Sequence, residues 1–192
     1  MDTTNTSTIL LAGLAILVIV VLLGIVFARR QRTKRLREQF GPEYERAVQE
    51  VGDKHRAESE LEARLDRMKS LEIRPLSPQE TERFTREWQA AQAQFVDEPL
   101  AAVQKANRLI KEVMNERGYP VDDFEQRAAD ISVDYPEMVT DYRELHTIAK
   151  QGDEEDVTTE EMRQAMVHAR ALFEHLVKPE AKVEETDQKE RM

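Results

Sequence analysis

The sequence predicts an all-α protein with one N-terminal transmembrane helix, a charged helical stalk and a small antiparallel helical bundle. Three observations lead to this fold class. Residues 9–28 contain no charged side chain and consist only of apolar residues and glycine. The apolar residues that follow recur at the helical period of 3.6. No segment outside residues 9–28 alternates polar and apolar residues with the period of two that a strand requires.

The predicted transmembrane helix covers residues 9–28. Twenty residues of α-helix rise about 30 Å, which is about the thickness of the hydrocarbon core of a bilayer. A cleaved signal peptide is the alternative interpretation. The short N-terminal tail, residues 1–8, has no Lys or Arg, and the apolar run is longer than the core of such a signal. We therefore expect an uncleaved anchor.

The orientation follows from the basic residues after the apolar run, since basic flanks remain in the cytoplasm. They are Arg29, Arg30, Arg32, Lys34, Arg35 and Arg37. We expect a single-pass protein of the cell membrane with its N-terminus outside and its C-terminal domain in the cytoplasm. The same cations lie within reach of anionic headgroups, so the lipid bilayer is an expected partner. A simple topology signal and specific lipid recognition are the two interpretations of this cluster.

The amino-acid composition argues against several classes of function. The chain carries a formal charge of −10, and beyond residue 37 there are 22 basic against 37 acidic residues. This acidic balance argues against a nucleic-acid-binding protein, which needs a basic face. The chain has no cysteine, which excludes disulfides, thiolate nucleophiles and cysteine-ligated zinc.

Residues 29–70 are predicted to form a basic juxtamembrane segment and a charged helical stalk. Residues 29–40 have no helix breaker, and Pro42 suits the first turn of a restarted helix. A heptad pattern over residues 42–70 places Lys54 and Glu58 at core positions and Gly52 inside the helix, which is poor for a sustained coiled coil. A homodimer through the stalk is the alternative to a single charged helix.

Residues 71–76 are predicted to be a linker, and residues 77–177 the helical bundle. Ser77 and Glu80 form a capping box around Pro78 at the first helical position. The helix that follows carries one apolar stripe that is typical of a buried face, formed by Phe84, Trp88, Ala91 and Phe95. A second helix begins at Pro99, and Gly118 and Pro120 stop it.

Three further helices complete the predicted bundle. A short one contains Phe124 to Ile131 and begins after an Asp cap. Asp134-Tyr135-Pro136 is predicted to open the next, which Gly152 ends before an acidic loop at residues 153–156. The last begins with a capping box of Thr158 and Glu161. Residues 178–192 have little to bury and are predicted to be disordered.

Several segments resemble a family of uncharacterised bacterial single-pass membrane proteins, which are sometimes labelled secreted. The likeness covers roughly residues 35–177, and its most distinctive part is the run GYPVDDFEQRAAD at residues 118–130. FGPEYERAV, IRPLSPQETERF and MVTDYRELHTIA contribute to it. The resemblance implies a bacterial source and the layout described above. It carries no established activity, so it implies no catalytic residue.

No catalytic residue, cofactor-binding loop or metal ligand set is assigned from the sequence. His168 and His175 are seven residues apart on one helix, about 10.5 Å along its axis, which is too far to share a metal. The one candidate recognition site is a corner formed by Tyr119, Asp122, Asp123 and Phe124. Its structural alternative is a rigid connection between helices, with Asp capping the second.

The expected function is that of a non-catalytic interaction or scaffold module anchored at the bacterial inner membrane. Its protein partner is not identified by the sequence. Two alternatives remain open at this point. One is an enzyme with an unrecognised acid–base site in the bundle, and the other is an extracytoplasmic or secreted helical protein.

Overall fold

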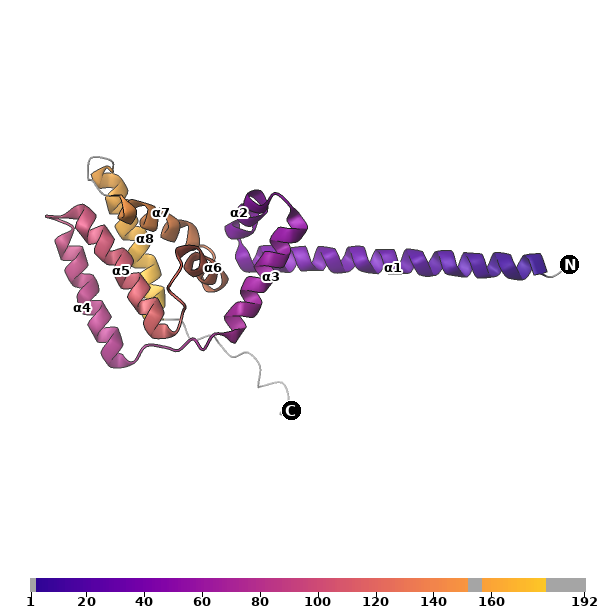
Figure 1. Ribbon diagram of the computed structural model, residues 1–192, viewed down its shortest axis with the longest axis horizontal. Helices are drawn as coiled ribbons and strands as arrows, with labels where there is room; N and C mark the ends of the chain where they lie inside the picture. The colour runs from indigo at the N-terminus through magenta and orange to yellow at the C-terminus, as the bar shows by residue number, and fades with distance from the viewer. Residues whose placement is uncertain (1–2, 152–156, 179–192) are drawn as a thin grey trace, which may run out of the picture. The chain divides into compact units, whose positions relative to one another are not determined.

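The computed structural model describes residues 3–151 and 157–178, with side chains at residue 17 and from residue 19 onward. The predicted all-α class is confirmed, because these residues form helices and no strand (Figure 1). The helices are α1 (Thr3–Phe40), α2 (Pro42–Val51), α3 (Lys54–Ser70), α4 (Pro78–Gln94), α5 (Pro99–Arg117), α6 (Phe124–Asp134), α7 (Val139–Lys150) and α8 (Thr159–Val177).

The chain divides into two compact units, residues 1–62 and residues 63–192, each of which is described here by itself. Their boundary falls inside α3. The predicted linker at residues 71–76 is non-helical, but it belongs to the second unit. Its backbone is tied there, because the Arg74 N–H donates to the Arg117 carbonyl at 2.9 Å.

The first unit contains α1, α2 and the beginning of α3. The predicted restart at Pro42 is confirmed, but residues 42–70 do not form one extended stalk. Gly52 ends α2 in the left-handed conformation, with φ +71°, which reverses the chain so that Glu58 accepts a hydrogen bond from Thr33 on α1. The unit buries a small core made of Leu36, Phe40, Tyr44, Ala47, Ala57 and Leu61.

No helix in the described part of the chain is long and apolar enough to cross a membrane. Of the predicted span, residues 9–16 and Val18 lie outside the described side chains. The apolar side chains from Leu17 to Phe27 that are described are exposed. Nine of them have 45–64% of their surface accessible.

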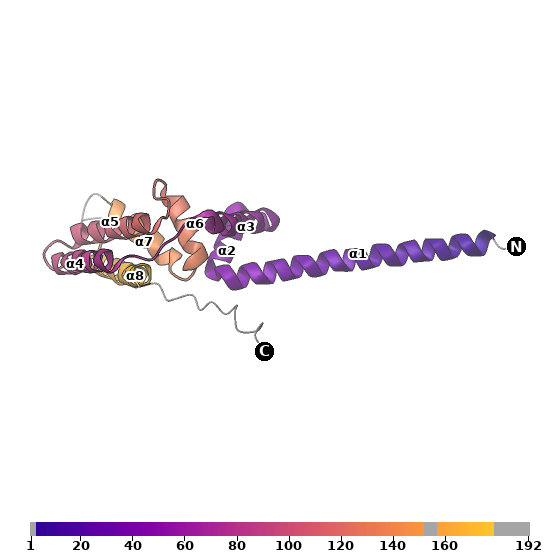
Figure 2. The same cartoon turned by 90° about the horizontal axis from the view of Figure 1, so that it is seen from below.

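The second unit is a helical bundle centred on α5, which packs against α4, α7 and α8. Figure 2 shows α4 and α8 in one layer and α5 in the other. The predicted stripe on α4 is largely confirmed, because Phe84 and Trp88 are buried and Trp88 stacks on Phe173 of α8 with ring centroids 4.8 Å apart. Phe95 follows the end of α4 and packs at the edge of the core.

Both predicted capping boxes are present. At each helix start the hydroxyl accepts from the backbone of the N3 glutamate, whose carboxylate accepts from the cap residue's backbone N–H. Asp123 caps α6 as predicted, accepting from the Gln126 N–H at 2.8 Å. Local polar signals therefore place the starts of α4, α6 and α8 correctly.

The predicted helix start at Asp134-Tyr135-Pro136 is wrong. α6 continues through Asp134, and α7 begins only at Val139 after a turn. Asp134 is the last helical residue of α6, so its backbone does not have the extended conformation of an N-cap, and its Oδ2 accepts a hydrogen bond from the Tyr119 hydroxyl at 2.7 Å. The predicted stop at Gly152 and the acidic loop at residues 153–156 lie outside the described residues, as does the predicted disordered tail at residues 178–192 except Lys178, whose N–H donates to the Glu174 carbonyl at 3.0 Å.

Candidate functional site

The predicted recognition corner is a packed connection between α5 and α6. Tyr119 is only 2% exposed, and burial followed by the charge of Asp134 raises the pKa of its hydroxyl. Asp123 is occupied as the cap of α6. Asp122 is exposed and Phe124 is half-buried. The structure therefore brings the four residues together, with Tyr119 and Asp123 engaged within the fold.

Phe124 packs on a histidine that the sequence left isolated. The rings of Phe124 and His146 are parallel within 7°, with centroids 3.6 Å apart. The Nδ1 atom of His146 lies 3.5 Å from the Asn107 side-chain amide. Burial, and after it the charges of Lys150 and Arg127, lower the pKa of His146 to about 4. The imidazole is therefore neutral at pH 7 and a weak base, which suits packing better than proton transfer.

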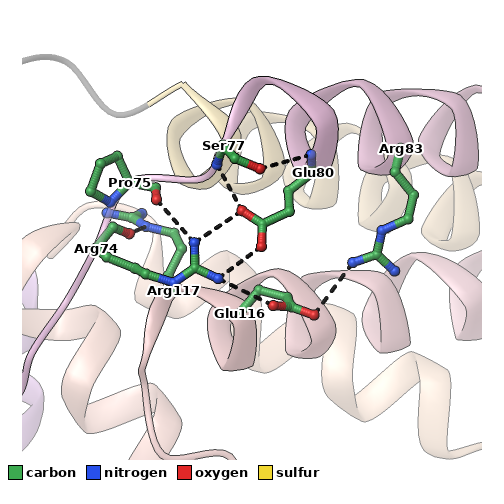
Figure 3. A network of polar contacts seen from close by, with 7 residues as sticks. All are labelled: Arg74, Pro75, Ser77, Glu80, Arg83, Glu116 and Arg117. Atoms are coloured by element: carbon green, nitrogen blue, oxygen red, sulfur yellow. Dashed lines mark hydrogen bonds and ion pairs between the residues drawn. The ribbon is translucent and has the colours of Figure 1, made fainter.

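A second polar cluster fastens the linker to the bundle (Figure 3). The guanidinium of Arg74 donates to both carboxylate oxygens of Glu80, at 2.9 and 2.8 Å, and reaches Glu116 at 3.3 Å. Arg83 contacts the other oxygen of Glu116 at 3.5 Å. The Arg74 ion pair, and then the Ser77 bonds, hold the pKa of Glu80 well below its usual value. Every charged side chain in this cluster is paired with another, so the cluster serves to stabilise the contact between the linker and the bundle.

Asp141, Glu144 and His168 form a third cluster, between α7 and α8. Nδ1 of His168 lies 3.7 Å from a carboxylate oxygen of each acidic residue. The three atoms that could bind a metal lie within 4.8 Å of one another. Among the described residues, these three have side-chain types that suit a divalent metal. All three side chains are partly exposed, at 26–60%, and exposed acidic groups commonly gather in this way without a metal.

The six predicted membrane-flanking cations do not have the same surroundings. Arg32 and Arg35 both pair with Glu62, at 2.7 and 3.5 Å. Lys34 and Arg37 pair more loosely with exposed glutamates, Glu38 at 3.7 Å and Glu45 at 3.1 Å. Arg29 and Arg30 are exposed and make no ion pair within the described residues.

The cations nearest the apolar run line a groove of about 560 Å³ between α1 and the first turn of α3. Its lining residues are Val26, Arg29, Arg30, Thr33, Lys34, Arg37, Glu38, Lys54, His55 and Glu58. Glu58 lies on the α3 side of this lining. It is 2% exposed, and its Oε1 accepts from the Thr33 hydroxyl at 2.7 Å and the Tyr44 hydroxyl at 2.9 Å.

The sequence did not indicate Lys54 and His55 as part of a site. The signal was present in Gly52, because a glycine stop there reverses the chain and returns the next helix to α1. Burial opposes ionisation of Glu58, but the bonds from Thr33 and Tyr44 and the nearby cations outweigh it and lower its pKa. Comparisons of the chain with protein-family models, curated proteins and solved structures find no match in any of the three.

Proposed function

We propose that this protein is a single-pass membrane protein that holds a non-catalytic helical interaction module at the membrane surface. Residues 9–28 are the proposed span, and the acidic second unit is the proposed interaction module on the cytoplasmic side. The resemblance to bacterial single-pass proteins agrees with this assignment and with a bacterial inner membrane. The partner protein is identified only as one that reaches that surface.

The observation that supports the proposal is that the apolar side chains near the end of the predicted span on α1 are exposed. Nine side chains between Leu17 and Phe27 have about half their surface accessible, and no other element covers them in the first unit. Contiguous apolar surface of this kind mostly marks a protein or membrane contact. Apolar side chains lie on all sides of this helix instead of along one stripe, which is typical of a span surrounded by lipid.

The basic cluster supports the orientation. Arg29 and Arg30 follow the apolar run directly, whereas the N-terminal tail has no basic side chain. The second unit carries 19 basic against 29 acidic residues, so an anionic membrane surface repels it. An anchor is therefore needed to keep such a unit close to the membrane, where its local concentration for a membrane-bound partner rises.

Alkaline carbonate extraction of membranes from cells expressing the full chain tests the anchor. We expect the protein to remain in the membrane pellet. Substituting both Val20 and Leu23 by Arg places two charges in the span, costs about 5–7 kcal/mol of insertion free energy and should release the chain. The matched control is Val96→Arg, which adds a charge at an exposed apolar site of the second unit. Release of the unmodified chain would refute the proposal.

The absence of cysteine gives a clean test of the orientation. Single substitutions Thr6→Cys and Gln89→Cys place one thiol on each side of the proposed span, and the unmodified chain is an unreactive background. A membrane-impermeant maleimide should label Thr6→Cys in intact cells and Gln89→Cys only after lysis. The reverse pattern would support the extracytoplasmic alternative.

A further inference from the structure

We infer that the groove between α1 and α3 binds the phosphate group of an anionic phospholipid. The inference deepens the proposed membrane anchoring and rests on it. The groove contains five cationic side chains against two carboxylates in a chain whose overall charge is −10. It also places these cations next to the apolar run, where a lipid headgroup would be found.

The cations available to a ligand are those that form no close ion pair within the described part of the first unit. Arg29 and Arg30 make no ion pair within the described residues. Lys34 and Lys54 each lie 3.7 Å from a carboxylate oxygen, which is longer than a hydrogen bond. Arginine and lysine side chains are the usual donors to phosphate oxygens. The groove therefore offers several donors that a phosphate could recruit without breaking a close ion pair.

The two helices that line the groove are joined by a partly buried hydrogen bond. Thr33 on α1 donates to Glu58 on α3, and Tyr44 donates to the same oxygen from α2. Glu58 lies one helical turn after Lys54 and His55, so this bond positions both side chains beside α1. A ligand site that is already formed loses less entropy on binding than one that must order its side chains.

A phospholipid fits this groove better than a free anion because one end of the groove is apolar. Val26 lines it, and Phe27 next to it is 64% exposed. Arg29 and Arg30 follow at about 1.5 Å of rise per residue, so these phosphate donors begin about 4.5–6 Å from Val26 along the helix. A molecule with a phosphate and an adjoining glycerol and acyl region would contact both parts.

Native mass spectrometry of the delipidated full chain in a neutral detergent tests the inference. The probes are phosphatidylglycerol, phosphatidylcholine and inorganic phosphate. We expect one saturable phosphatidylglycerol per chain, weaker binding of phosphatidylcholine and no competition by inorganic phosphate at equal concentration. Equal affinity for the two lipids would overturn the charge argument, and effective competition by inorganic phosphate would overturn the lipid assignment.

Variants on α3 separate the groove from the topology signal, which lies on α1. Lys54→Gln should weaken phosphatidylglycerol binding about fivefold, since one cation near a headgroup contributes about that factor. Arg56→Gln is the matched control, because it removes the same charge from the same exposed turn but does not line the groove. Equal effects of the two variants would overturn the site.

Two further variants keep the test decisive. Arg30→Gln removes a groove cation that makes no ion pair within the described residues, so its effect does not depend on a lost internal contact. Thr33→Val keeps every cation but removes the hydrogen bond to Glu58, and should also weaken binding. Retained binding in both variants would refute the inference. Failure of membrane anchoring would show instead in carbonate extraction, which this detergent assay does not involve.

Discussion

Replacing Gly118 by Ala should destabilise the second unit more than a glycine C-cap ordinarily predicts. Gly118 has φ +96°, in the left-handed region that costs a residue with a Cβ about 1–2 kcal/mol. A Cβ built there lies 2.7 Å from the carbonyl oxygen of Glu72, which is backbone and cannot rotate away. The neighbouring Arg74 N–H is bound to the Arg117 carbonyl, so the linker must move with that bond.

The two contributions together give an expected loss of about 2–4 kcal/mol. Urea unfolding of the full chain in mild detergent measures it, followed by the fluorescence of Trp88. This is the single tryptophan of the chain and lies in the second unit, so its signal reports the unit that contains Gly118. A loss below about 1 kcal/mol would refute the reasoning, because it would mean that Glu72 yields freely.

Gly118→Asn separates the two contributions. Asparagine adopts the left-handed conformation more readily than alanine but carries the same Cβ. If the contact with Glu72 dominates, Asn and Ala should destabilise equally; if backbone conformation dominates, Asn should recover most of the stability. Gly52 is the matched control, with φ +71° and no atom within 4 Å of a built Cβ. Gly52→Ala, measured by circular dichroism, should cost only about 1 kcal/mol.

Two other predictions concern side chains of the bundle. Trp88→Ala should cost about 3–5 kcal/mol of unfolding free energy by circular dichroism and Trp88→Phe much less, whereas unchanged melting would mean an exposed ring. His146, with a folded pKa of about 4 below the ordinary 6.5, binds fewer protons when folded, so stability should fall as pH drops from 6.5 to 4. After allowance for its partial exposure this amounts to about 1–2 kcal/mol, and His146→Gln should lose that pH dependence; an unchanged profile would contradict the shift.

Helix starts and buried faces in the second unit were predictable because their causes are local. A capping box needs only residues three positions apart, as at Ser77 and Glu80, and an apolar stripe needs only the helical period. The same rules failed at Asp134. Asp134 followed by Pro136 fits a helix start by local criteria, but α6 continues through Asp134, whose carboxylate accepts a hydrogen bond from Tyr119, fifteen residues earlier. This hydrogen bond joins positions too far apart in the sequence for a local pattern to contain it.

The candidate site was harder to predict for the same reason. The basic residues on α1 were visible as a cluster, but the groove also needs Lys54 and His55, which come near α1 only after the turn at Gly52. The prediction of an extended stalk was wrong because Gly52 ends α2 instead of lying inside one long helix. A left-handed glycine at that position changes which side chains share a surface, although it carries no side chain itself.

The pairing of charges in the first unit also changes how strongly the basic cluster can attract a membrane. Six cations counted from the sequence would each contribute up to about 1 kcal/mol at an anionic surface. Arg32 and Arg35 share the single carboxylate of Glu62, and Arg37 lies 3.1 Å from Glu45, so two carboxylates partly compensate these three cations within the unit. Arg29, Arg30 and the loosely paired Lys34 remain, and Arg29 and Arg30 are the two closest to the apolar run. Substituting these two should therefore weaken membrane attraction more than substituting Arg32 and Arg35, although each pair removes the same formal charge.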